Sequence, residues 1–136
     1  MGQRVVELDG RGLTLPLAER IVFGEEKVKP TEGALQRVER ASQAVRRAIG
    51  RGERIYGVST GFGKLSDRLI PPEQQRMLQE NLLKSHAVAV GGALPREVSR
   101  AALLFRLNSL LKGYSGVRRE IIHYLGELLN CKVYPS

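Results

Sequence analysis

The sequence has no tryptophan, one cysteine and few aromatic residues, which make up 5% of its 136 positions. A single cysteine excludes an internal disulfide framework, so we expect a reducing, cytoplasmic setting. No apolar run approaches the roughly 20 residues that span a bilayer. The first ten residues, MGQRVVELDG, lack the apolar stretch of a signal peptide. We therefore expect a cytoplasmic protein with no membrane partner.

Aliphatic side chains and positive charge are abundant. Hydrophobic residues form 42% of the chain, too large a share for a disordered protein. The 22 Lys and Arg residues outnumber the 14 Asp and Glu residues and give a net charge of +8. A basic balance raises nucleic acid as a partner, because phosphate contacts dominate such binding. The length is that of one ordinary domain.

The charge is densest between residues 37 and 54, where a long helix is expected. At about 100° per residue, one face of this helix is apolar and carries Leu35, Val38, Val45 and Ile49. The opposite face carries Arg40, Arg47, Arg51 and Arg54. This pattern is typical of a solvated helix face, with a nucleic-acid stripe or a subunit contact as alternatives. No aromatic residues alternate with these arginines, and we expect no nucleic-acid partner.

Caps, prolines and glycines predict a mainly α fold with minor β content. A short strand and turn are expected within residues 5–15, and further strand content around Tyr56. The polar segment 25–30, EEKVKP, is expected only to break the chain. Three of the helices are expected to start after a capping residue, which is Thr14, Thr31 or Ser115. The five helices expected are 16–23, 32–50, 72–87, 95–112 and 116–130.

The irregular stretch 55–69, IYGVSTGFGKLSDRL, is the main candidate for chemistry. It does not fit a phosphate-binding loop, because Val58 stands where the first glycine belongs and Leu65 where a Ser or Thr belongs. Glycine permits positive φ and close approach of the backbone to a ligand. The loop could therefore present Tyr56 to a site, although a half-buried packing role is the alternative for this side chain.

The two histidines have different settings. His86 shares a helix face with Leu78 and Leu82, which predicts that it points toward the core. It is either a satisfied core residue or a group that recognises a ring or moves a proton at a cavity. His123 is expected in solvent. Neither has further ligands at suitable spacing, so we expect no metal site.

Three ordered blocks resemble the aromatic amino acid ammonia-lyases. Residues 56–63, YGVSTGFG, look like the family's tyrosine loop, although its histidine branch usually has Asn where Ser59 stands. Residues 81–87, NLLKSHA, resemble the family's Asn-Leu-x-x-Ser-His-Ala segment. Residues 106–118, RLNSLLKGYSGVR, are similar to the next block. The resemblance covers nearly the whole chain and is strongest from residue 55.

The resemblance implies an activity and the residues that carry it. Tyr56 matches the catalytic acid/base group, and His86 matches the position that recognises the substrate side chain. The loop that presents the site would include Gly57, Thr60, Gly61 and Gly63. The Ser-His-Ala segment favours an imidazole, and so the non-oxidative deamination of L-histidine to trans-urocanate and ammonia. Tyrosine-specific lyases and aminomutases also use His here, so tyrosine remains an alternative substrate.

The resemblance also indicates what this chain does not carry. The family's electrophile, a methylidene-imidazolone, forms from an Ala-Ser-Gly tripeptide, which does not occur in the 136 residues. We therefore expect residues 1–136 to be a single N-terminal domain, with the prosthetic-group segment and a helical bundle beyond its C-terminus. The family forms homotetramers with shared sites. The 136 residues alone are expected to be inactive.

Overall fold

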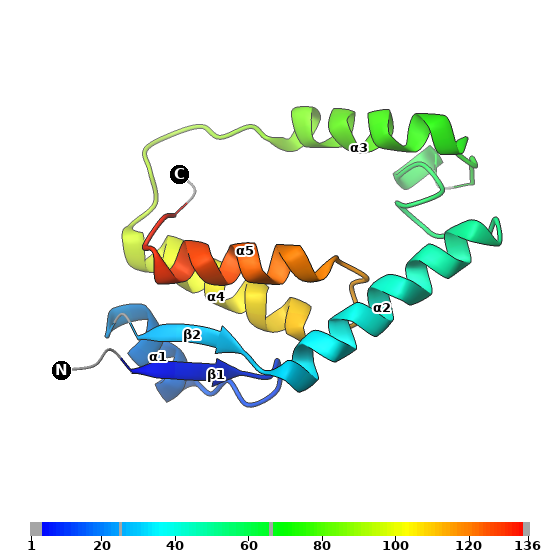
Figure 1. Ribbon diagram of the computed structural model, residues 1–136. Coiled ribbons are helices and arrows are strands. Elements are labelled where there is room, and N and C mark those ends of the chain that lie inside the picture. The colour runs from blue at the N-terminus through cyan, green and yellow to red at the C-terminus, as the bar shows by residue number, and fades with distance from the viewer. Residues whose placement is uncertain (1–3, 25, 66, 135–136) are drawn as a thin grey trace. The chain divides into compact units, whose positions relative to one another are not determined.

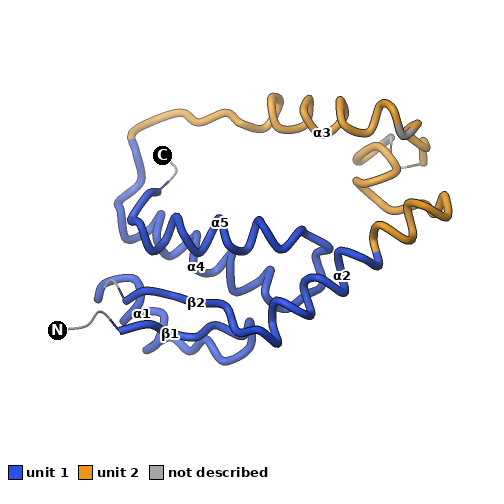
Figure 2. The backbone as a smooth tube through the Cα atoms, in the orientation of Figure 1, with its two compact units in different colours: residues 1–44, 93–136 blue, residues 45–92 orange. Residues whose placement is uncertain are grey.

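The computed structural model describes residues 4–24, 26–65 and 67–134. Within them the elements are five α-helices, one short 3₁₀ helix and two short strands (Figure 1), which confirms the mainly α class. The chain forms two compact units (Figure 2): residues 1–44 with 93–136 make unit 1, and residues 45–92 make unit 2. No helix of the described residues is long and apolar enough to cross a membrane. A single N-terminal domain over residues 1–136 stays a prediction.

Unit 1 begins with a strand–helix–strand motif. Strands β1 (Val5–Leu8) and β2 (Lys27–Pro30) pair in parallel. Parallel pairing needs a crossover connection, and helix α1 (Leu15–Phe23) supplies it (Figure 1). The predicted Thr14 cap is confirmed, because its hydroxyl accepts the N–H of Leu17.

Strand β2 corrects the expectation that the EEKVKP segment only breaks the chain. Its side chains alternate between exposed and buried, and Val28 lies in the core at 3% exposure. A four-residue strand with one fully buried side chain shows too little periodicity to stand out in the sequence. Its pairing with β1 becomes favourable only after α1 has reversed the chain.

Three longer helices complete unit 1. Helix α2 (Glu32–Gly50) starts after Thr31, whose hydroxyl accepts the N–H of Ala34 as predicted, and continues into unit 2. Helix α4 (Arg96–Leu111) follows Pro95, and α5 (Arg119–Asn130) follows Arg118 without a side-chain cap. The Ser115 cap was therefore wrong, because the helix begins three residues later than expected. The core of unit 1 includes Leu8, Ile21, Val28, Val38, Leu104, Leu107, Leu111, Ile122 and Leu129.

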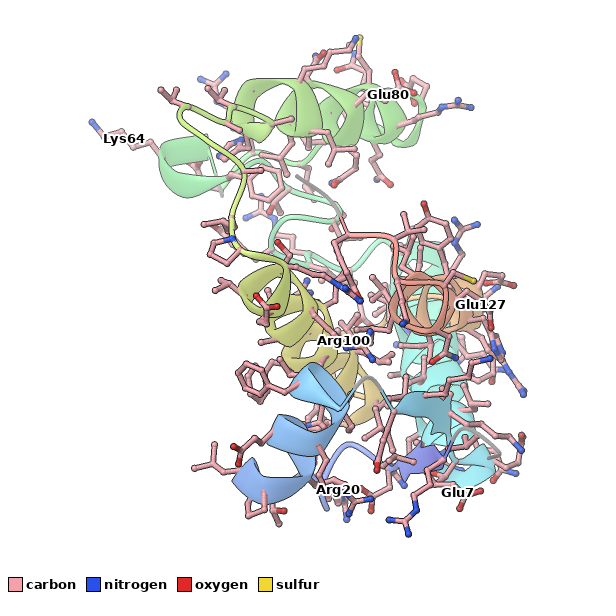
Figure 3. All side chains as sticks on the ribbon, turned by 90° about the vertical axis from the view of Figure 1, so that its left-hand side faces the viewer. Glu7, Arg20, Lys64, Glu80, Arg100 and Glu127 are labelled. Atoms are coloured by element: carbon pink, nitrogen blue, oxygen red, sulfur yellow. The ribbon has the colours of Figure 1, made fainter. Side chains whose placement is uncertain are left out.

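A buried arginine joins the helix ends of unit 1. Arg100 of α4 is 2% exposed and extends into the interior (Figure 3). Its guanidinium donates to the carbonyls of Ile21 (2.8 Å), Leu129 (2.7 Å) and Glu26 (3.1 Å) and to the Tyr134 hydroxyl (2.9 Å). The last carbonyls of a helix have no partner within the helix. Arg100 therefore satisfies carbonyls in the final turns of α1 and α5.

Unit 2 contains the end of α2, a loop with a 3₁₀ turn at Gly63–Leu65, and helix α3 (Pro72–His86). The strand content expected around Tyr56 was wrong, because the described residues there form turns, with one isolated bridge between Thr60 and Leu69. The arginine-rich face of α2 is solvated as expected. Arg40 and Arg47 on this face are exposed, and so are Arg51 and Arg54, which follow the end of the helix.

Candidate functional site

The loop before α3 has a polar interior of its own. Ser59 and Thr60 are 6% and 2% exposed. The Ser59 hydroxyl accepts the N–H of Ile55 and donates to the carbonyl of Glu53, both at 2.8 Å. The Thr60 hydroxyl donates to the carbonyl of Gly61. Because these buried hydroxyls have hydrogen-bond partners nearby in the sequence, this irregular segment keeps a defined path.

This path places Tyr56 at the surface. Its side chain is 66% exposed, and its hydroxyl oxygen accepts the N–H of Gly63 at 3.4 Å. Its ring meets the ring of Phe62 edge to face, with centroids 5.9 Å apart and an interplanar angle of 82°. Gly57 makes this arrangement possible, because its φ is +69° and a Cβ there would lie 2.7 Å from the Phe62 ring. The loop thus exposes a phenol whose ring and oxygen both have contacts.

His86 lies in the last turn of α3, and its side chain is exposed. The expectation that it points toward the core was wrong. Leu78 and Leu82, on the same face, are half-buried, whereas His86, in the last turn, is exposed. Leu82, Leu83, His86 and Ala87 instead line a shallow apolar pocket.

The ring of His86 is held from one side. Its Nδ1 lies 3.0 Å from the carbonyl oxygen of Leu82 and 3.0 Å from the hydroxyl oxygen of Ser85. A carbonyl oxygen only accepts, so the contact with Leu82 requires the proton on Nδ1. In that tautomer Nε2 is a hydrogen-bond acceptor. It can receive an N–H or O–H from a ring-bearing ligand.

Helix α3 and the tyrosine loop are joined by Gln79. Its Nε2 donates to the carbonyl of Gly57 at 2.9 Å. Unit 2 therefore contains Tyr56, His86 and the predicted loop residues Gly57, Thr60, Gly61 and Gly63, and it links the loop to the helix that carries His86. Tyr56 and His86 have different hydrogen-bond partners, which are Gly63 for Tyr56 and Leu82 and Ser85 for His86. Gln79 could not be predicted from the sequence, because no spacing rule connects a helix glutamine to a carbonyl 22 positions earlier.

Other predicted features belong to unit 1 or have no counterpart among the described residues. His123 is exposed on α5, as expected, and belongs to unit 1. Among the residues with described positions, no three His, Cys, Asp or Glu side chains gather at metal-binding distance. Cys131 is exposed and unpaired by disulfide.

A family model and curated relatives identify the same group of proteins as similar to this chain. Residues 13–136 match the family model described as aromatic amino acid lyase. The histidine ammonia-lyase of Bacillus velezensis is 47% identical over 131 residues, which cover 96% of this chain and 26% of that protein. The chain thus spans about a quarter of the length of the curated relatives that it matches.

Solved structures share the fold. The ergothionase of Treponema denticola superposes with a TM-score of 0.90 at 30% identity, covering 96% of this chain and 26% of that one. The tyrosine aminomutase of Streptomyces globisporus superposes with a TM-score of 0.86 at 30% identity, covering 92% and 24%. The fold and the sequence therefore point to the same group of proteins.

Proposed function

Because the chain belongs to the aromatic amino acid lyase family, we propose that it supplies Tyr56 and His86 to the active site of a histidine ammonia-lyase. The reaction is the elimination of ammonia from L-histidine to give trans-urocanate. The Cβ–H and Cα–N bonds break, a Cα–Cβ double bond forms, and the amine leaves as ammonia. The observation that carries the proposal is the exposed Tyr56, held on a glycine loop that is tied to the helix bearing His86.

Tyr56 is proposed as the acid/base group. Its oxygen accepts the Gly63 N–H, which orients the phenol and leaves a lone pair and its own proton for exchange with a substrate. A positioned group of this kind contributes roughly 10²- to 10⁴-fold to a rate. The contacts with Phe62 and Gly63 restrain the position of the phenol oxygen, which favours such catalysis.

His86 is proposed as the group that selects the substrate ring. With its proton on Nδ1, Nε2 accepts the N–H of an imidazole. A phenyl ring has no donor to offer, so it would leave this nitrogen without a partner. A tyrosine hydroxyl could make the same bond, which keeps a tyrosine ammonia-lyase or aminomutase as the alternative. The identity to histidine ammonia-lyases favours histidine.

The family's methylidene-imidazolone would supply an electrophile for the substrate amine. It forms from Ala-Ser-Gly, and the 136 residues contain no such tripeptide. The 136 residues therefore do not hold the residues that generate the group. Tyr56 and His86 are their proposed contribution to a site that is completed by other parts of a longer subunit and shared within a homotetramer. The 136 residues alone should release no ammonia from any aromatic amino acid.

The test uses the proposed full-length subunit and follows urocanate by absorbance. Tyr56→Phe should lower kcat at least about 100-fold, because a positioned acid/base group is lost. Tyr124→Phe is the matched control, because Tyr124 is similarly exposed but lies on α5. Full activity of Tyr56→Phe would refute the role of the phenol. Ammonia release by the 136 residues alone would refute the shared site.

A further inference from the structure

The hydrogen bond between Gln79 and Gly57 lies next to the proposed acid/base group. Gly57 follows Tyr56 directly, and its carbonyl belongs to the Gly57–Val58 peptide unit, one Cα beyond the peptide unit that joins Tyr56 to Gly57. The Gln79 carboxamide donates to this carbonyl at 2.9 Å, a favourable length for a neutral hydrogen bond. The hydrogen bond from the Gly63 N–H to the Tyr56 hydroxyl oxygen, at 3.4 Å, is longer. Gln79 is therefore well placed to restrain the backbone immediately after Tyr56.

The position of Gln79 on α3 adds a second element. Gln79 and His86 are seven residues apart, which is nearly two full turns of an α-helix and about 10 Å along its axis. Residues at this spacing lie on the same helix face. The face that holds the tyrosine loop is thus the face that carries the ring-selecting histidine.

The rest of the loop is anchored elsewhere. The Ser59 hydroxyl bonds to residues 53 and 55, and the N–H of Ile70 donates to the Ser59 carbonyl. Gln75, one turn before Gln79 on α3, donates to the carbonyl of Ile70 at 3.2 Å. Two glutamines of one helix therefore hold the two ends of the loop, and Gln79 holds the end at Tyr56.

We propose that Gln79 is a positioning residue, which fixes Tyr56 relative to the His86 face of α3 by donating to the carbonyl of Gly57. The inference rests on the proposed function. Gln79 touches no reacting atom and acts only through the backbone of the tyrosine loop. This role requires that residue 79 donate a hydrogen bond. A side chain of the same length and helix propensity that cannot donate would not replace it.

The first experiment measures amide hydrogen exchange in the 136-residue chain. Gln79→Met keeps the length of the side chain and suits a helix but cannot donate. The amides of residues 57–59 should exchange about 2- to 12-fold faster, the range that follows from the net worth of one hydrogen bond. Gln75→Met is the matched control and should affect Ile70 instead. Unchanged exchange at residues 57–59 in Gln79→Met would overturn the inference.

The second experiment measures kcat and KM in the full-length subunit. Gln79→Lys retains a donor, whereas Gln79→Met and Gln79→Glu do not, and all three are unbranched side chains that favour helices. We expect kcat to fall about tenfold for the Met and Glu variants and to stay within about threefold of wild type for Lys, with KM changed less than about twofold. Packing alone would not order the variants by donor capacity.

The outcomes separate the inference from the function on which it rests. Equal kcat values for Gln79→Met and Gln75→Met would overturn the positioning role and leave the lyase activity standing. A wild-type subunit without turnover on any aromatic amino acid would overturn the proposed function. The exchange measurement would still decide whether Gln79 holds the loop.

Discussion

The side chain of Asn130 pairs with the backbone of Val28 as a neighbouring strand would. Its Oδ1 accepts the Val28 N–H at 2.9 Å, and its Nδ2 donates to the Val28 carbonyl at 3.0 Å. Lys27 and Thr31, on the other edge of this segment, donate toward β1. One carboxamide from α5 therefore satisfies the outer edge of β2 at Val28, where the strand would otherwise have an unpaired donor and acceptor.

Replacing Asn130 should destabilise unit 1. Asn130→Leu keeps the approximate volume but leaves both Val28 groups without a partner, so the free energy of unfolding should fall by about 1–3 kcal/mol. Urea denaturation of the 136-residue chain measures this change. Asn108→Leu is the matched control, because the Asn108 side-chain oxygen is buried and has no hydrogen-bond partner among the described residues. Its loss should cost much less. Equal effects of the two variants would contradict the strand-like role of Asn130.

Replacing Arg100 should have a larger effect. Arg100→Met removes the donors to the carbonyls of Ile21 and Leu129 while it keeps an apolar stem in the core. We expect a loss of about 2–4 kcal/mol of unfolding free energy, since several buried acceptors lose their partner. Arg106→Met, on the exposed side of the same helix, should change stability by less than about 0.5 kcal/mol. Similar losses for the two variants would contradict the role of Arg100 in satisfying the carbonyls of Ile21 and Leu129.

Asp9 should make stability depend on pH in the acid range. Its pKa is lowered from 3.8, first by the N–H of Gly12 and then by the N–H of Arg11, which donate to Oδ1 at 2.7 and 2.8 Å. Because the folded state has the lower pKa, this contribution is present above pH 3.8 and is lost as the pH falls through the folded value.

The measurement is the difference in melting temperature between wild type and Asp9→Asn. The difference should be constant from neutral pH down to about pH 5 and should shrink below pH 4, since the wild-type carboxylate then becomes protonated. A difference that grew on acidification would have the wrong sign for a carboxylate with a lowered pKa.

Gly57→Ala should disturb the proposed site more than its backbone strain explains. Alanine at positive φ costs about 1–2 kcal/mol at either Gly57 or Gly52, where φ is +69° and +72°. At Gly57 the new Cβ would also press on the Phe62 ring, which contacts Tyr56, whereas nothing lies within 4 Å at Gly52. In the full-length subunit, kcat should fall about tenfold more for Gly57→Ala than for Gly52→Ala. Similar kcat values would mean that Phe62 does not position the phenol.

His86→Phe should change substrate choice. The variant loses the Nε2 acceptor, so kcat/KM for histidine should fall at least about 100-fold, and phenylalanine should become the better substrate. His123→Phe, which alters an exposed histidine of unit 1, should leave kcat/KM unchanged for histidine and for phenylalanine. In wild type, the ratio of kcat/KM for histidine to that for tyrosine decides between the two proposed substrates. Retained histidine preference in His86→Phe would remove His86 from ring recognition.

Local signals in the sequence predicted most helices but not the tertiary contacts. The hydroxyls of Thr14 and Thr31 accept an N–H only three residues later, so these caps can be predicted from a short stretch of sequence. Strand β2 has no such signal, because its stability depends on β1 and on Asn130, which is 102 residues away. Ser115 has the residue type of a cap, but Gly116 with φ +68° follows it, and the helix starts only after Arg118.

The site was predictable in part for the same reason. The glycine pattern around Tyr56 follows from local backbone requirements, and the turns and positive φ at Gly57 agree with it. Periodicity places His86 on the face of Leu78 and Leu82, but it does not show that the last turn of this face is exposed. Arg100 and Gln79 act on carbonyls far away in sequence, so only the folded chain identifies their partners.

The division of unit 1 into two separate segments has a consequence for folding. Arg100 joins Ile21 across 79 positions and Asn130 joins Val28 across 102, so the contacts that close this unit are non-local. Non-local contacts slow folding, because a long loop must close before they form. During synthesis, the first 44 residues leave the ribosome without the helices that bury their apolar side chains. Their core is completed only when residues 93–136 have followed.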